Sequence, residues 1–405
     1  MKKSFLKAAF YLSLAATVST VVVSCGLDDE EDTEIINNTI DPNNFNGKIA
    51  AGTTVTLDPS KTYKLNGKMV VENGASLIIP AGTKIVADKG SNYLIVDRGG
   101  KIFINGTEAK PVVFEGSVNE PGHWGGLVIL GNAPTNRSAS GTSTSELGDL
   151  VYGGNNKEDN SGIIKYVIIK NSGFKYNAEK EFNGLSLFGV GSGTTISHVS
   201  ILDGADDGIE FFGGNVNADH LLILGVGDDY VDWTEGWQGT LDYVYAARKK
   251  EYFNAAEPGN RGIEADTNDK DPITNDGNGA SNPTVKNITL IGNTKGQEPQ
   301  GMKIRAGSNG KFDNVVIANY TTGIDFETDR TFDWFKGGNY LNNIRFVNVG
   351  TNWKVKATTA NPNPDMSTTI KENTSATGAG NGTSLPAWAK TWSTVNTFDV
   401  ADAGN

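Results

Sequence analysis

One short pattern recurs along the chain: an apolar residue, two polar ones, and then two apolar residues separated by any residue. The seven segments that share it are IKYVII at 164–169, ISHVSI at 196–201, ADHLLI at 218–223, LDYVYA at 241–246, VKNITL at 285–290, FDNVVI at 312–317 and LNNIRF at 341–346. The equivalent residues His198, His220 and Tyr243 lie 22 and 23 residues apart. A unit this short holds three short strands and no helical crossover. The repeat therefore predicts stacked coils of parallel β-structure.

A second series of strands follows the first six segments. Its members are GLSLF from 184, GIEFF from 208, YVDWT from 230, GIEAD from 262, GMKIR from 301 and GIDFE from 323. Glycine makes up 50 of 405 residues, which favours short strands joined by tight turns. We expect an all-β fold, a parallel β-helix over residues 46–350, and a right-handed one because parallel crossovers take that hand.

The central polar position of the first series forms one column along the coils. Its members are Tyr166, His198, His220, Tyr243, Asn287, Asn314 and Asn343. The column resembles the asparagine ladder of pectate-lyase-type β-helices. The repeat as a whole resembles the same class of proteins, the pectin-lyase-like β-helices. This resemblance implies side chains that stack along the axis and satisfy the backbone groups of a turn. A metal site at His198 and His220, about 5 Å apart on adjacent strands, is the alternative.

Carboxylates recur at the same interval in the second series. The stretch GADDGIEFFGG begins at 204, and GDDYVDWTEG follows at 227. One coil separates them, so Asp207 should lie beside Asp229, and Glu210 beside Asp232. Glu264 falls in the column of Glu210 one coil later, and Asp206 and Asp228 belong to the preceding turns. Strand alternation points Glu210 and Asp232 to solvent and turns Phe211 and Trp233 into the core.

Carboxylates about 5 Å apart repel one another and raise one another's pKa unless something compensates. Calcium is one compensator, because it takes six to eight oxygens in irregular geometry. The hydroxyl groups of a polysaccharide are a second, and water with dissolved salt is a third. The candidate ligand-binding residues are Asp206, Asp207, Glu210, Asp228, Asp229, Asp232 and Glu264. Trp237 and Tyr252 lie near this acidic face and are candidate sugar platforms.

The same residues resemble part of the polygalacturonase pattern. Asp207 in ADDG takes the place of one catalytic carboxylate, and Asp228 and Asp229 in GDDYV take the places of the others. Two further motifs of that family are missing, because no histidine follows His220 and KIR at 303–305 reverses the family's Arg-Ile-Lys. A pectate-lyase-like alternative, with calcium and an arginine base, has Arg261 or Arg305 as candidates. A binding protein is therefore favoured over a glycoside hydrolase or polysaccharide lyase.

The amino-terminal residues have the features of an export signal. Residues 1–24 contain three lysines and then an apolar run, which predicts a secretory signal peptide. The only cysteine, Cys25, follows VVVS, which resembles the lipobox of bacterial lipoproteins and implies a diacylated Cys25. The acidic run LDDEED at 27–32 resembles the export signal of Bacteroidota surface lipoproteins. Residues 25–45 would then be a tether to the outer membrane, with the β-helix displayed at the cell surface.

The remaining expectations concern partners and the carboxyl-terminal end. A net charge of −12 argues against a nucleic-acid partner, because phosphate binding needs a basic face. A polysaccharide or an outer-membrane protein suits the long side of a solenoid, and an accessory role in an uptake system is a further possibility. Residues 351–405 should form a loop and a cap, in which LPAWAKTWS at 385–393 is a short helix covering the last open coil.

Overall fold

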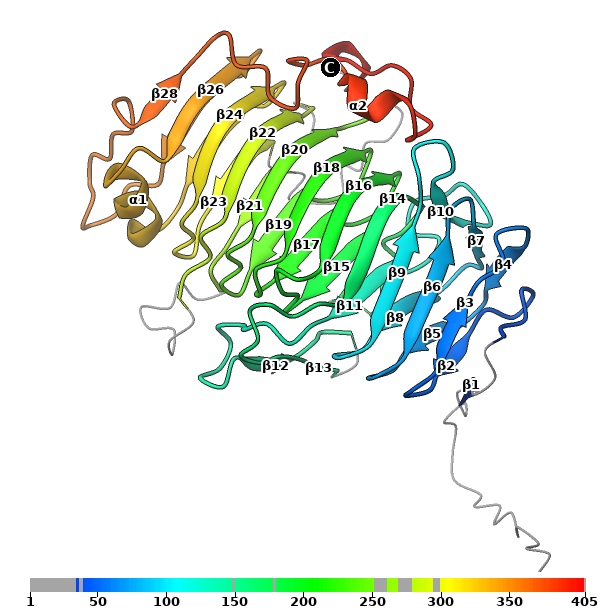
Figure 1. Ribbon diagram of the computed structural model, residues 1–405. Helices are drawn as coiled ribbons and strands as arrows, with labels where there is room; N and C mark the ends of the chain where they lie inside the picture. Colours follow the sequence, from blue (N-terminus) through cyan, green and yellow to red (C-terminus); the bar gives the residue numbers. More distant parts are fainter. Residues whose placement is uncertain are drawn as a thin grey trace, which may run out of the picture. The chain divides into compact units, whose positions relative to one another are not determined.

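The computed structural model describes residues 34–35, 39–147, 150–177, 180–250, 261–268, 279–293 and 299–403. Strands from successive coils lie side by side in parallel, so the predicted parallel β-helix is confirmed (Figure 1). The predicted signal peptide, Cys25 and Tyr252 fall outside the described residues. Within that part of the chain, no helix is both long and apolar enough to cross a membrane.

The first sheet contains one strand from each coil, paired in the order of the chain. Its strands are β1 (Glu34–Ile35), β2 (Gly47–Ile49), β5 (Lys68–Val71), β8 (Tyr93–Val96), β11 (Leu127–Leu130), β15 (Leu185–Phe188), β17 (Ile209–Phe212), β19 (Val231–Thr234), β21 (Ile263–Ala265), β23 (Gln300–Ile304), β25 (Thr322–Phe326) and β27 (Thr351–Val355). The second series of sequence segments supplies β15 to β25. This sheet therefore carries the acidic residues.

The second sheet is built from the first series of segments. Its long strands are β14 (Gly162–Lys170), β16 (Thr195–Leu202), β18 (Asn217–Leu224), β20 (Thr240–Ala247), β22 (Thr284–Ile291), β24 (Lys311–Ala318) and β26 (Leu341–Val347), and β28 (Ile370–Glu372) ends it. In the first coils, shorter strands replace each long one: β3 (Thr54–Thr56), β6 (Ser76–Pro80) and β9 (Lys101–Asn105) on one side, and β4 (Thr62–Leu65), β7 (Lys84–Ala87) and β10 (Val112–Gly116) on the other. β14 pairs with β9 through its first half and with β10 through its second half.

Each long strand bends at the predicted polar column. Tyr166, His198 and Asn343 have φ angles of 51°, 56° and 53°. The parallel strand pairing is interrupted at this one position and resumes at the next residue. A left-handed conformation costs about 1–2 kcal/mol for a residue other than glycine. Stacking and side-chain hydrogen bonds offset that cost. The ring centroids of His198 and His220 are 4.3 Å apart, and Asn314 donates to Asn287 over 2.8 Å. The ladder prediction is confirmed.

Inward-facing side chains fill the coils with a continuous apolar core. Phe211 and Trp233 lie in it, fully buried, as strand alternation predicts. Trp237 is buried as well and stacks on Phe211 with ring centroids 4.1 Å apart. The expectation that Trp237 offers an exposed platform is therefore wrong, because the residue follows a turn that returns its ring to the core.

The carboxyl-terminal segment takes a different place from the one predicted. It forms the short helix α2 (Ala387–Lys390) and a 3-10 turn (Val400–Ala403). Its buried residues Leu385, Ala389 and Trp392 pack against Leu222 and Tyr245, on the outer side of the second sheet. The segment thus covers the side of the coils and not the last one (Figure 1). The second sheet presents an apolar outer face there, which the segment buries.

Two insertions complete the described fold. The hairpin β12 (Thr142–Thr144) and β13 (Val151–Gly153) lies between β11 and β14, and covers a small apolar cluster on the outer side of the first sheet. The helix α1 (Asp329–Lys336) replaces the turn between β25 and β26 and inserts Phe335 into the core. β27 and β28 continue the two sheets beyond residue 350.

Candidate functional site

The acidic residues lie on the outer face of the first sheet, in the predicted register. Glu210 of β17 pairs with Asp232 of β19, which pairs in turn with Glu264 of β21. One turn earlier in each coil, the backbone N–H of Asp229 donates to Oδ1 of Asp207 over 2.9 Å. The prediction that one winding of 22 residues brings these carboxylates side by side is confirmed.

These carboxylates line a hollow of about 270 Å³ and do not simply face solvent. Strand alternation turns Glu210 and Asp232 outward, as predicted. The expectation that both point freely into solvent is wrong, because both side chains are half-buried. The reason is that two chain insertions rise beside the sheet and contribute Glu146, Lys180 and Glu181 to the hollow. The complete set of acidic lining residues is Glu146, Glu181, Asp206, Asp207, Glu210, Asp228, Asp229, Asp232 and Glu264.

The insertion residues had no signal in the sequence that linked them to the site. Glu146 lies in the loop after β12, and Glu181 and Asn183 lie just before β15, outside the positions that repeat from coil to coil. Asn183 also orients the site directly, because its amide donates to Oε2 of Glu210 over 2.6 Å. Only the folded chain brings these residues to the repeat.

Carboxylate oxygens crowd together in three overlapping groups. The groups are Asp206 with Asp207 and Asp228, Asp207 with Glu210 and Asp232, and Asp229 with Asp232 and Glu264, and in each group one oxygen per residue lies within 4.8 Å of the others. Burial, and then the neighbouring negative charges, raise the pKa of Asp206, Asp207, Glu210 and Asp232 well above the usual range. For the same reasons the pKa of Glu264 rises to about 8. The protein alone therefore holds these carboxylates at an energetic disadvantage when they are ionised.

In the later coils, the carboxylates of the outward column of the first sheet are neutralised by lysine or arginine side chains. Further along it, Nζ of Lys354 lies 2.8 Å from Asp325 and Nζ of Lys303 lies 3.6 Å from Glu327. Glu264 is paired with Arg261 and Arg305 at 2.9 and 3.0 Å.

Glu210 and Asp232 form no ion pair with any described residue, although Lys180 lines the same hollow. Oδ1 of Asp232 is buried and has no hydrogen-bond partner among the described residues. This part of the column lacks a positive charge that the rest of the column has.

Asp207, Asp228 and Asp229, the three residues of the polygalacturonase-like pattern, lie close together, but both oxygens of Asp229 already accept hydrogen bonds. Oδ1 of Asp229 accepts the backbone N–H of Arg261, and Oδ2 accepts the guanidinium of Arg261 over 3.2 Å. Oxygens of Asp207 and Asp228 approach within 4.8 Å, whereas an inverting hydrolase separates its two carboxyl groups by about 6.5–9.5 Å. Both arginines that a lyase could use as a base, Arg261 and Arg305, are paired with carboxylates.

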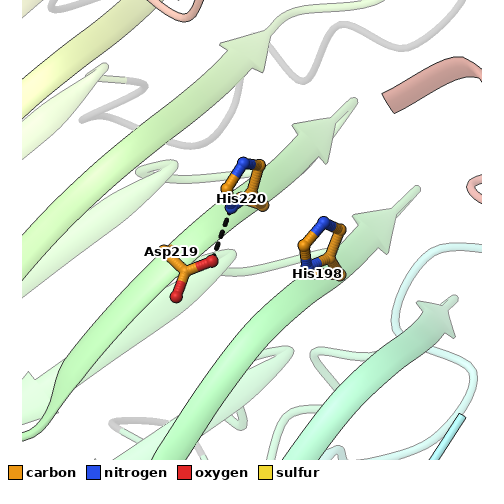
Figure 2. Close-up of side chains that lie close together, drawn as sticks. All are labelled: His198, Asp219 and His220. Carbon is orange, nitrogen blue, oxygen red and sulfur yellow. Dashed lines mark hydrogen bonds and ion pairs between the residues drawn. The ribbon is translucent and has the colours of Figure 1, made fainter. Parts of the chain in front are cut away.

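His198, Asp219 and His220 form another cluster of possible metal ligands, on the second sheet (Figure 2). Nδ1 of His220 bonds to Asp219 at 2.5 Å, and Nδ1 of His198 bonds to Ser197 at 2.8 Å. The two imidazole rings are parallel within 6°. A metal ion lies in the plane of a histidine ligand, and one ion cannot lie in two parallel planes. The geometry therefore fits the stacked ladder and not a shared metal.

A family model described as a pectate-lyase-like β-helix domain matches residues 47–393 of the chain. The chain belongs to this family. The matched range includes every described residue that lines the acidic hollow. No protein of curated function matches the chain.

Two solved structures are distantly similar to this pectate-lyase-like β-helix. The enzymatically active domain of tailspike protein 2 from bacteriophage CBA120 is 12% identical, with a TM-score of 0.30, over 71% of this chain and 39% of that one. PfbA, a surface adhesin of Streptococcus pneumoniae, is 12% identical, with a TM-score of 0.28, over 76% of this chain and 86% of PfbA. This chain thus spans well under two thirds of the tailspike domain's length. These likenesses are too distant to bear on function.

The raised pKa values predict how stability depends on pH in the absence of divalent cations. A carboxyl whose pKa is higher in the folded state binds more protons there, so stability falls as the pH rises from the unfolded to the folded pKa. For Glu264 this window runs from 4.5 to about 8. In EDTA, the free energy of unfolding should fall across it by about 1.4 kcal/mol per pH unit for each excess proton.

Urea titrations at several pH values measure this slope. The double variant Glu210→Gln, Asp232→Asn should flatten it, whereas Asp88→Asn, at a surface ion pair with Lys64, should leave it unchanged. A wild-type protein whose stability is flat or rises over the window would contradict the electrostatic account.

Proposed function

We propose that this β-helix is a non-catalytic binding protein whose acidic hollow holds a calcium ion. One observation carries the proposal: Glu210 and Asp232 lie side by side with no ion-pair partner among the described residues, whereas Glu264 and Asp325 in the same column are paired with basic side chains. A bound cation would supply the missing charge. It would also give the buried Oδ1 of Asp232 a partner, and each unpaired buried polar atom is otherwise unfavourable.

The donor set suits calcium better than other common cations. All the crowded donors are carboxylate oxygens, which hard cations prefer, and zinc or copper would favour histidine or cysteine. Calcium accepts six to eight oxygens in irregular arrangements, whereas magnesium demands a near-ideal octahedron. The three overlapping oxygen groups are irregular and close, as a flexible calcium shell allows.

The ligand recognised through that cation is proposed to be a polysaccharide or a partner protein. A cation at the bottom of an open hollow keeps positions for oxygens from outside, such as sugar hydroxyl or carboxylate groups. The side of a solenoid is long enough for a polymer to lie along it. The wall residues Glu146, Lys180 and Glu181 would then contact the ligand beside the cation.

Calcium should stabilise the wild-type protein, because a ligand that binds only the folded state shifts the unfolding equilibrium. At a free concentration one hundred times Kd, the expected gain is about 2.7 kcal/mol. Thermal melts at pH 7.5, with and without millimolar calcium, measure it. Asp232→Asn should abolish most of the gain, and Glu120→Gln, at an exposed carboxylate elsewhere, should preserve it. A melt that is the same in EDTA and calcium would refute the calcium site.

We further propose that the β-helix is tethered to the outer membrane through diacylated Cys25 and faces the outside of the cell. The support is the lipobox-like VVVSC segment and the acidic LDDEED segment, which precede a polar stretch and then the first coil at residue 47. Two acyl chains anchor firmly, because each buried methylene contributes about 0.8 kcal/mol. An accessory role in an outer-membrane uptake system is compatible with the same placement.

Cell fractionation tests the anchor. The wild-type protein should pellet with membranes and be digested by protease added to whole cells, and Cys25→Ala should release it from the membrane fraction. Cys25→Ala protein that still pellets and stays accessible to protease would contradict lipidation at this residue.

Polysaccharide hydrolysis or lysis is a second candidate, favoured by the raised pKa of Asp207. A carboxyl whose pKa is raised by burial and by neighbouring negative charge holds its proton more firmly, as a general acid must. Release of reducing or unsaturated ends from polygalacturonate or other glycans, lost in Asp207→Asn and Asp228→Asn, would establish this activity. No turnover on a broad glycan panel, with calcium binding intact, would leave the binding function alone.

A further inference from the structure

A second hollow, larger than the acidic one, lies on the other sheet. It has a volume of about 590 Å³ and is lined by the first halves of β22, β24 and β26 together with β28. It shares no lining residue with the acidic hollow. In Figure 1 these strands are the yellow-to-orange ones near α1. Neither the repeat nor the calcium proposal accounts for it.

Lysines dominate the charge of this hollow. Lys286, Lys311 and Lys371 line it, against one carboxylate, Asp313. Nζ of Lys286 is 3.0 Å from Asp242, and Nζ of Lys371 donates to the carbonyl of Thr368. An ammonium group has three donors, so each retains capacity for a ligand.

The third lysine, Lys311, and the single carboxylate, Asp313, add to the excess of positive charge in the hollow. Lys311 is exposed, and its ammonium group forms no hydrogen bond or ion pair with the described residues. Asp313 accepts a hydrogen bond from the side-chain amide of Asn343 over 2.7 Å, so one of its oxygens already has a donor. On a chain with a net charge of −12, the lining of this hollow is locally positive.

An aromatic side chain forms one wall of the hollow and is held rigidly. The rings of Tyr340 and Trp334 stack with centroids 4.6 Å apart and planes within 7°. Nε1 of Trp334 donates to the carbonyl of Gly310 over 3.2 Å, and Phe335 of the same helix is anchored in the core. A fixed, half-buried tyrosine presents an apolar surface together with a polar hydroxyl.

Amide and hydroxyl side chains supply neutral hydrogen-bonding groups around the lysines and the ring. Asn342 and Thr284 line the hollow with them. The strands set their spacing, because Lys286, Asp313 and Asn342 are consecutive partners across β22, β24 and β26. Cations, amides and an aromatic ring together match a sugar ring that carries acidic groups, because ammonium groups bind carboxylate or sulfate strongly.

We propose that this lysine-lined hollow binds an acidic saccharide, with Lys286, Lys311 and Lys371 facing its carboxylate or sulfate groups and Tyr340 facing its ring. The site is independent of the calcium proposal, because it contains no cluster of carboxylates and lies on a different sheet. The β-helix would then hold an acidic glycan on its second sheet, away from the acidic hollow on its first sheet.

Calorimetric titration of the full protein in EDTA tests the proposal and keeps the calcium site out of the measurement. The probes are a heparin hexasaccharide, a hyaluronan hexasaccharide and the neutral maltohexaose, which separate sulfate, carboxylate and uncharged sugars. At least one acidic probe should bind saturably and change tryptophan fluorescence, and Trp334→Phe should remove that change. Lys311→Glu should raise Kd at least tenfold.

A matched variant separates a site from general charge attraction. Lys61→Glu makes the same change of charge at an exposed lysine of an early coil and should alter Kd less than twofold. Three outcomes would overturn the proposal: no binding of either acidic probe, equal binding of maltohexaose, or equal loss in Lys61→Glu and Lys311→Glu. Lys371→Glu gives a second reading if Lys311→Glu lowers the melting temperature.

Discussion

Parallel pairing between successive coils is the interaction on which the rest of this structure depends. Backbone hydrogen bonds hold each strand about 4.8 Å from its equivalent one coil later, so residues 22 positions apart become lateral neighbours. The same rule builds an apolar core from Ile209 and Val231 and an acidic column from Glu210 and Asp232. A solenoid therefore turns any residue repeated once per coil into a row of like side chains.

Rows of like side chains are favourable or unfavourable depending on their chemistry. At the bend of the long strands, Tyr166, His198, His220 and Tyr243 stack as flat rings, and Asn287 and Asn314 hydrogen-bond along the axis. On the first sheet, a row of carboxylates is unfavourable. Lys303, Lys354 and the two arginines relieve it in the later coils. The proposed cation would do the same in the middle coils.

The insertions convert exposed rows into partly buried hollows. Without the loops that contribute Glu146, Lys180 and Glu181, Glu210 and Asp232 would face water, where solvent screens their repulsion. With the loops beside them, both carboxylates are half-buried and their pKa values rise. On the second sheet, α1 plays the corresponding part, because it positions Tyr340 at the edge of the lysine-lined hollow.

The period of the coils, the faces of the strands and the residue pairs that one winding brings together could all be predicted from the amino-acid sequence. The reason is that alternation and a 22-residue repeat are local properties, and parallel pairing then leaves a single register for Asp207 and Asp229 or for Glu210 and Asp232. What lies over those faces could be seen only in the folded chain. Trp237 points into the core, the segment with Trp392 packs on the side of the coils, and the insertions form the walls of the acidic hollow. Each of these depends on contacts between residues far apart in the chain, for which the repeat carries no signal.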